Sequence, residues 1–135
     1  MTPRHLPTFG WPLLFLLIVA LSGCMRSPVS GARRAAQEAS SRHHIKQLTL
    51  ALVQFHEDQQ QWPDQLTEVL PFLNGDTSVL NNPITDEEFG YDYVKPTIAP
   101  EDPQSSTTVV IYQLRDGKRD TELEVGYLDG SVKTL

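Results

Sequence analysis

The chain has 135 residues, with 11 Lys and Arg against 17 Asp and Glu and a formal net charge of −6. This length suits one small domain. The acidic balance argues against nucleic-acid binding, which requires a basic surface. The sequence contains one cysteine, so an internal disulfide is excluded.

The N-terminus has the organisation of a secretory signal. Arg4 and His5 lie in a short leading stretch, and an apolar run extends from Trp11 to Leu21. The run closes on Leu21-Ser22-Gly23-Cys24, which resembles the lipobox of bacterial lipoproteins. That resemblance implies signal cleavage between Gly23 and Cys24, and attachment of lipid, including palmitate, to Cys24.

Two alternatives to a lipid anchor are weaker. A transmembrane helix needs roughly 20 apolar residues, and this run is about half as long. A plain secretory signal would leave Cys24 as a lone thiol in an oxidising compartment. We therefore expect a lipoprotein anchored to a bacterial membrane, inner or outer, with its domain on the extracytoplasmic side of the cell envelope.

Charge divides the remaining chain unevenly. Residues 25–50 hold five basic side chains against one acidic side chain, whereas residues 51–135 hold five against sixteen. A basic stretch beside a lipid anchor favours anionic head groups, although solvated helix faces explain it equally well. We expect a signal peptide over residues 1–23, an anchored polar helical stalk over residues 24–44 and a folded head over residues 45–135.

The first element predicted after the signal is a long helix. Ser27-Pro28 suits a helix start, and good helix formers continue to about Gln60. Ile45, Leu48, Leu52 and Phe55 lie at helical spacing and predict one buried stripe. Trp62-Pro63 then predicts the end of the helix.

Short elements are predicted next. Asp64 is the expected cap of a second helix that ends at Leu70, and loops follow at Asn74-Gly75-Asp76 and Asn81-Asn82-Pro83. Residues 89–94 alternate and predict a strand, before an irregular proline-rich link over residues 96–106.

The C-terminal third predicts a strand over residues 109–114 and a hairpin whose two-residue turn is Asp129-Gly130. In that register Tyr127 pairs with Val132, and Val125 shares their face. About four antiparallel strands then cover the helix stripe, which gives an α+β domain with a long N-terminal helix packed on a C-terminal sheet.

The same order resembles the heads of type IV pilins and type II secretion pseudopilins. Two segments carry the resemblance. The first is residues 28–58, PVSGARRAAQEASSRHHIKQLTLALVQFHED, which the Trp62-Pro63 pair follows. The second is residues 125–133, VGYLDGSVK. The resemblance implies a pilin-like fold and a structural or interaction role, near a secretion or pilus-like system.

The chain also departs from that family. The glutamate-bearing N-terminal motif and the long apolar half-helix are missing, and the lipobox stands in their place. Burial of Arg33, Arg34 and Arg42 in a filament core without partners would be costly. We therefore expect the mature domain to be a monomer that forms no filaments.

Candidate ligand residues are few. His44 and His56 are twelve residues apart, so one helix cannot bring them to one ion, and His43 and His44 point in different directions. Asp86, Glu87, Glu88 and Asp92 form the best calcium candidate, because calcium prefers several oxygen ligands from a flexible loop. A solvated acidic loop is the simpler interpretation.

Trp62, Tyr91, Tyr93 and Tyr127 are either core residues or an aromatic ligand patch. No catalytic motif is recognised. The sequence therefore favours a non-catalytic envelope lipoprotein with an unidentified envelope partner, and the alternative is a ligand- or calcium-binding lipoprotein.

Overall fold

The structure is a computed structural model that describes residues 27–135. The chain divides into two units between Ala35 and Ala36. The second unit holds the head of the protein. The described α-helix is α2 (Ser27–Gln59), which belongs partly to each unit. The 3-10 helices are η1 (Leu66–Leu73), η2 (Thr77–Leu80) and η3 (Pro103–Ser106). The strands are β1 (Tyr91–Tyr93), β2 (Val109–Arg115), β3 (Lys118–Arg119), β4 (Val125–Tyr127) and β5 (Val132–Lys133).

Helix α2 confirms the predicted long helix. It ends at Gln59, because Gln60 takes a left-handed conformation with φ 57°. The Gln60 N–H still donates to the His56 carbonyl at 2.8 Å, which satisfies one of the last free carbonyls of the helix. Among residues 27–135 no helix combines the length and apolar character needed to cross a membrane.

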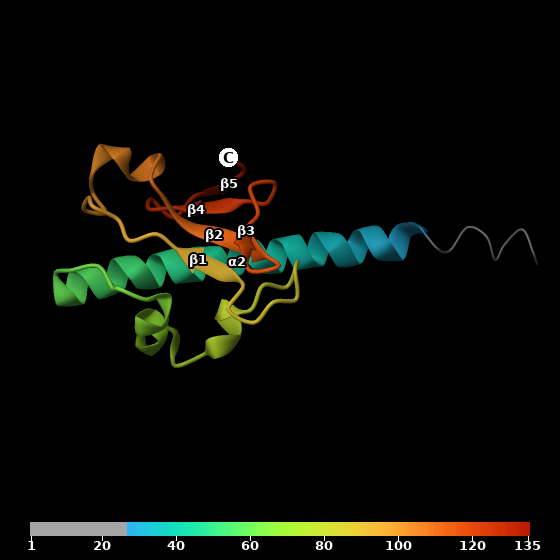
Figure 1. The fold of residues 1–135 in the computed structure, drawn as a ribbon, viewed down its shortest axis with the longest axis horizontal. Helices are drawn as coiled ribbons and strands as arrows, with labels where there is room; N and C mark the ends of the chain where they lie inside the picture. The colour runs from blue at the N-terminus through green and yellow to red at the C-terminus, as the bar shows by residue number, and fades with distance from the viewer. Residues whose placement is uncertain (1–26) are drawn as a thin grey trace, which may run out of the picture. The chain divides into compact units, whose positions relative to one another are not determined.

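The C-terminal strands form one antiparallel sheet in the order β1-β2-β4-β5, with β3 paired to the end of β2 (Figure 1). The α+β class and the helix packed on a C-terminal sheet are therefore as predicted. The additional strand is β3, which is two residues long.

The predicted apolar stripe lies between α2 and the sheet. Ile45, Leu48 and Leu52 are each fully buried, and Phe55 packs at the margin of the same core. Gly126 on β4 permits this close contact. A Cβ atom at Gly126 would lie 2.5 Å from the Ile45 Cγ2 atom, closer than carbon atoms approach.

A β-bulge in β2 adds to the core. Val109 pairs with Tyr127 while Ile111 pairs with Gly126, so Val110 is the extra residue between them. Both Val110 and Ile111 are fully buried and belong to the core. The bulge thus turns two successive apolar side chains inward, which strict alternation cannot do.

The predicted register of the C-terminal hairpin is wrong by one residue. Gly126 pairs with Val132, and the Tyr127 N–H donates to the Ser131 carbonyl at 2.9 Å. Of the two turn residues, Gly130 alone has positive φ, at 85°, so the turn is not the two-residue type that needs positive φ at both. The loop has three residues, and Val132 therefore shares the inward face of Gly126 rather than that of Tyr127.

The predicted strand over residues 89–94 is shorter than expected. Strand β1 begins at Tyr91, because Phe89 has a φ of 52° and cannot continue a strand. Gly90, which lies between Phe89 and Tyr91, is buried.

The second predicted helix is the 3-10 helix η1, which begins at Leu66 rather than after Asp64. Glu68 organises its start, since its carboxylate accepts from the backbone N–H groups of Asp64 and Gln65, each at 2.7 Å. The Asp64 side chain instead pairs with Lys95.

Candidate functional site

The acidic segment predicted as a calcium candidate forms a tight loop before β1. Asp86, Glu87 and Glu88 line a hollow of about 330 Å³, together with His44 from α2 and residues 81–83. Asp92 lies on β1, where its carboxylate accepts from Arg119 on β3 at 2.5 Å. The structure thus brings three of the four candidates to one hollow and leaves Asp92 out.

Part of this acidic set already has a structural role. The Glu87 carboxylate accepts from the backbone N–H of Asp116, in the turn between β2 and β3. In the part of the chain that the structure describes, no three His, Cys, Asp or Glu side chains are grouped as a metal ion requires. Calcium binding stays a prediction.

The backbone of the acidic loop is held from both sides. The Asn82 N–H donates to the Glu87 carbonyl at 2.9 Å, and the Asp86 N–H donates to the Asn82 carbonyl at 2.8 Å. The Asn82 side-chain oxygen also accepts from the Ile84 N–H at 2.9 Å. The loop is therefore closed on itself around a single buried asparagine.

That asparagine belongs to a buried polar cluster that joins α2, the loop and the sheet. The Gln113 amide oxygen on β2 accepts from Ser41 at 2.8 Å and from Asn82 at 2.9 Å. Its amide nitrogen donates to the Glu124 carbonyl at 2.9 Å. Ser41 also lies 3.2 Å from the Tyr91 hydroxyl. Each of these side chains is hydrogen-bonded inside the protein, which fixes α2 against the sheet.

Sequence reasoning missed this cluster, because Ser41 and Asn82 are residue types typical of solvated helix faces and loops. One signal was present in β2. Gln113 stands two residues after Ile111 and therefore on the same inward face of the strand. A polar side chain at an inward position predicts a buried partner.

The histidines are separated, as their spacing predicts. His44 contacts the loop, with its Nδ1 atom 3.1 Å from the Asn81 carbonyl oxygen. His56 stacks on Trp62 with ring centroids 4.3 Å apart. His43 is exposed.

The four aromatic residues do not form one patch. Trp62 and Tyr91 are core residues, and the Trp62 indole N–H donates to the Ile98 carbonyl at 3.0 Å. Burial raises the pKa of Tyr91 to about 12. Burial, with Asp64 and Glu68 nearby, also raises the pKa of Tyr93. Tyr127 lies apart from them, and the ammonium of Lys133 is 4.9 Å from the centre of its ring.

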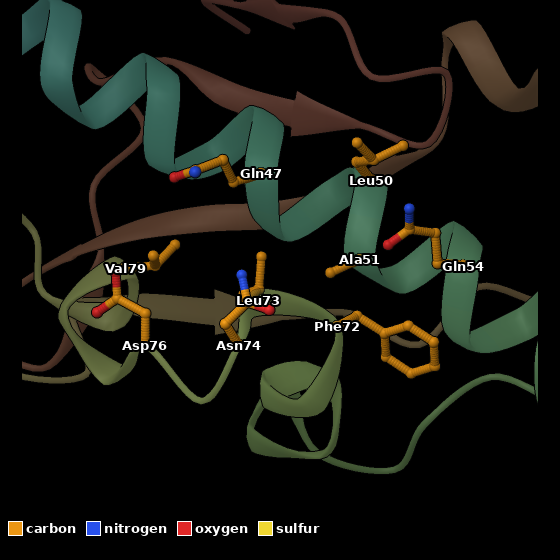
Figure 2. A pocket seen from close by; sticks show the side chains of 9 residues that line it. All are labelled: Gln47, Leu50, Ala51, Gln54, Phe72, Leu73, Asn74, Asp76 and Val79. Atoms are coloured by element: carbon orange, nitrogen blue, oxygen red, sulfur yellow. The ribbon is translucent and has the colours of Figure 1, made fainter.

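A second hollow, of about 410 Å³, runs between α2 and the segment from η1 to η2 (Figure 2). Ala51 and Val79 are buried in its wall, and Leu50 points away from η1 and η2 and is 60% exposed. A third hollow, of about 270 Å³, shares Leu50 and includes Lys46 and Asp129. The complete lining of the second hollow is Gln47, Leu50, Ala51, Gln54, Phe72, Leu73, Asn74, Asp76 and Val79.

The two residues of the predicted processing site, Gly23 and Cys24, lie outside the residues that the structure describes. Comparison with protein-family models, with curated proteins and with solved structures finds no match for this chain.

Proposed function

We propose that this protein is a non-catalytic lipoprotein of the bacterial cell envelope, with lipid on Cys24 and a pilin-like head that acts as a structural or protein-interaction module. The observation that carries the proposal is the tetrapeptide Leu21-Ser22-Gly23-Cys24 after a short apolar run. Two or more acyl chains on one cysteine anchor a protein stably, whereas a single chain holds it only marginally.

The head supports a role in interaction rather than chemistry. Ser41, Asn82 and Gln113 use their polar groups to join the helix, the loop and the sheet. Arg42 on α2 likewise forms two hydrogen bonds with the Glu124 carboxylate, at 2.5 and 3.1 Å. These contacts make a rigid support from which surface features of the head are presented to another protein.

The missing filament motif leads to a further part of the proposal. The head acts as a monomer, because it lacks the apolar half-helix, and it serves beside a secretion or pilus-like system without polymerising. Sedimentation of the mature lipoprotein in detergent tests this part. A single species of monomer mass is expected, and ordered fibres under the electron microscope would contradict it.

Metabolic labelling with an alkyne analogue of palmitate tests the anchor directly. The full chain and a Ser22→Ala variant, which keeps a small residue before the cysteine, are both expected to incorporate the label. Cys24→Ala is expected to lose the label and to retain its signal. Equal labelling of Cys24→Ala would disprove lipidation at this residue.

A further inference from the structure

Phe89 combines exposure with an unusual backbone conformation. Its side chain is 60% exposed, and its φ is 52°. A bulky residue with positive φ is a genuine outlier, because the side chain crowds the backbone. Such conformations persist only where surrounding contacts hold them, and they concentrate at functional positions.

The contacts that hold Phe89 are visible on both sides of it. The Gly90 N–H donates to the Leu80 carbonyl, and the Gly90 carbonyl accepts from the Leu114 N–H, both at 2.9 Å. Gly90 is tightly enclosed, since a Cβ atom there would lie 2.5 Å from the Asn82 Cβ atom. On the other side, Glu87 is bound through its carbonyl to Asn82. The chain is thus fixed immediately before and after an aromatic ring that it leaves in solvent.

The residues that precede this ring in the chain are acidic. Asp86 and Glu88 are exposed beside it in the chain. Of the three cations in the neighbouring β2–β3 hairpin, Arg115 is paired with Asp120 at 2.6 Å, Arg119 is paired with Asp92 at 2.5 Å, and Lys118 is exposed. The loop therefore carries an exposed apolar ring next to two exposed carboxylates.

We infer that Phe89 is the anchor of a protein–protein contact, inserted into an apolar pocket with a Lys- or Arg-rich rim on a second envelope protein. This inference rests on the proposed role of the head as an interaction module. Binding energy at interfaces concentrates in a few aromatic or arginine anchors, and a preformed loop loses little entropy on binding. Opposite charge around the pocket then selects the partner and speeds association.

A second copy of this chain fits Phe89 less well. The hollow along α2 has Asp76 as its one charged lining residue, which would repel Asp86 and Glu88. The hollow that shares Leu50 offers one cation, Lys46, beside the carboxylate of Asp129. Charge complementarity therefore favours a different, basic partner.

Site-specific photo-cross-linking in cells of the source organism tests the inference. The photoreactive residue p-benzoylphenylalanine replaces Phe89 in the full chain, and replaces Leu135, which is 61% exposed, in a matched control. We expect an adduct with one envelope protein at position 89, at least tenfold stronger than at position 135. The cross-linked peptide is expected to come from an apolar pocket flanked by Lys or Arg.

Charge variants sharpen the result. Glu88→Lys in the position-89 cross-linker protein is expected to lower the adduct at least fivefold, whereas Glu101→Lys, an exposed acid outside the loop, is expected to leave it unchanged. Equal adducts at positions 89 and 135, an adduct with a second copy of this chain, or insensitivity to Glu88→Lys would each overturn the inference. Thermal unfolding of each purified variant confirms that the head is folded.

Palmitate labelling of the same cells separates this inference from the proposed function. A labelled protein without the adduct at position 89 overturns the anchor role of Phe89 and leaves the lipoprotein proposal standing. An unlabelled protein that still gives the adduct overturns lipidation and retains the contact.

Discussion

Gly126 and Gly90 both let two parts of the chain approach more closely than any other residue would allow, but their surroundings differ. At Gly126 the close neighbour is the Cγ2 atom of Ile45, in the apolar contact between α2 and the sheet. At Gly90 the close neighbour is Asn82, a buried amide in a polar cluster. Beside Gly126 the apolar residues are buried, whereas beside Gly90 an aromatic ring is left in solvent.

This difference shows that close packing serves two purposes in the same small domain. In the helix–sheet core it maximises apolar burial, which is the main source of stability. In the loop it holds a strained residue in place, which lowers stability locally and presents Phe89 outward. Single substitutions in either region test this difference.

The largest effect is expected in the core. Leu52→Ala should lower the free energy of unfolding by about 2–5 kcal/mol, because a buried side chain is removed and a cavity remains. Leu50→Ala is the matched control on the same helix, since Leu50 is 60% exposed and Leu52 is fully buried. Urea denaturation measures both. Equal losses would mean that the α2 stripe is not the core.

Substitution of the core glycine ranks next. Gly126→Ala should cost about 1–3 kcal/mol, because the new methyl group overlaps the Ile45 Cγ2 atom. Ile45→Leu removes that atom, so the double variant should lose less stability than the sum of the two single changes. Strict additivity in the denaturation experiment would show that the two sites do not touch.

The buried polar cluster predicts sensitivity to alkali. Because burial raises the pKa of Tyr91 to about 12, the folded state keeps the proton that the unfolded state releases near pH 10. This stability is complete below pH 10 and is lost as the pH rises from about 10 to about 12, by roughly 1–2 kcal/mol. Tyr91→Phe should remove its share of this loss and leave that of Tyr93, whose pKa is also raised by burial.

At pH 7, Tyr93→Phe is the comparison for Tyr91→Phe. The Tyr93 hydroxyl is buried without a hydrogen-bond partner, so its removal should be neutral or stabilising at pH 7. Removal of the Tyr91 hydroxyl should cost about 1 kcal/mol at the same pH, because its contact with Ser41 is lost. Identical costs at pH 7 would contradict the assigned hydrogen bonding.

The smallest effect is expected in the loop, and its sign is opposite. Phe89→Asn should raise the free energy of unfolding by about 0.5–1 kcal/mol, because asparagine tolerates positive φ better than phenylalanine does. The same change should abolish the partner contact inferred above. A clear loss of stability on Phe89→Asn would show that the ring contributes to the fold rather than to an interface.

Much of the fold follows from patterns in the sequence. Ile45, Leu48 and Leu52 recur at helical spacing, and the strand over residues 109–114 is β-branched and aromatic, so both elements are confirmed. The predicted position of the C-terminal hairpin is confirmed, and its predicted register is wrong by one residue. A two-residue and a three-residue loop both place Asp129-Gly130 at the turn, and the choice depends on how Gly126 packs beneath Ile45.

The candidate site is less accessible to such reasoning. Acidic residues 86–88 are conspicuous in the sequence, but the conformation of Phe89 depends on hydrogen bonds to Leu80 and Leu114, which are distant in the chain. The same holds for Ser41 and Gln113, whose partnership spans 72 residues. Contacts between residues so distant in the chain produce no periodic pattern in the local sequence, so they cannot be predicted from such patterns.

Native-state hydrogen exchange of the Gly90 amide tests most directly whether the loop is a rigid support for Phe89. The Gly90 N–H donates to Leu80 at 2.9 Å, and the Leu128 N–H at the core donates to Thr108 at the same distance. We predict protection factors for the two amides within about tenfold of each other, because both should open only with the whole head. Exchange of Gly90 at the rate of an unstructured amide would mean that Phe89 lies on a mobile loop, which contradicts a rigid support.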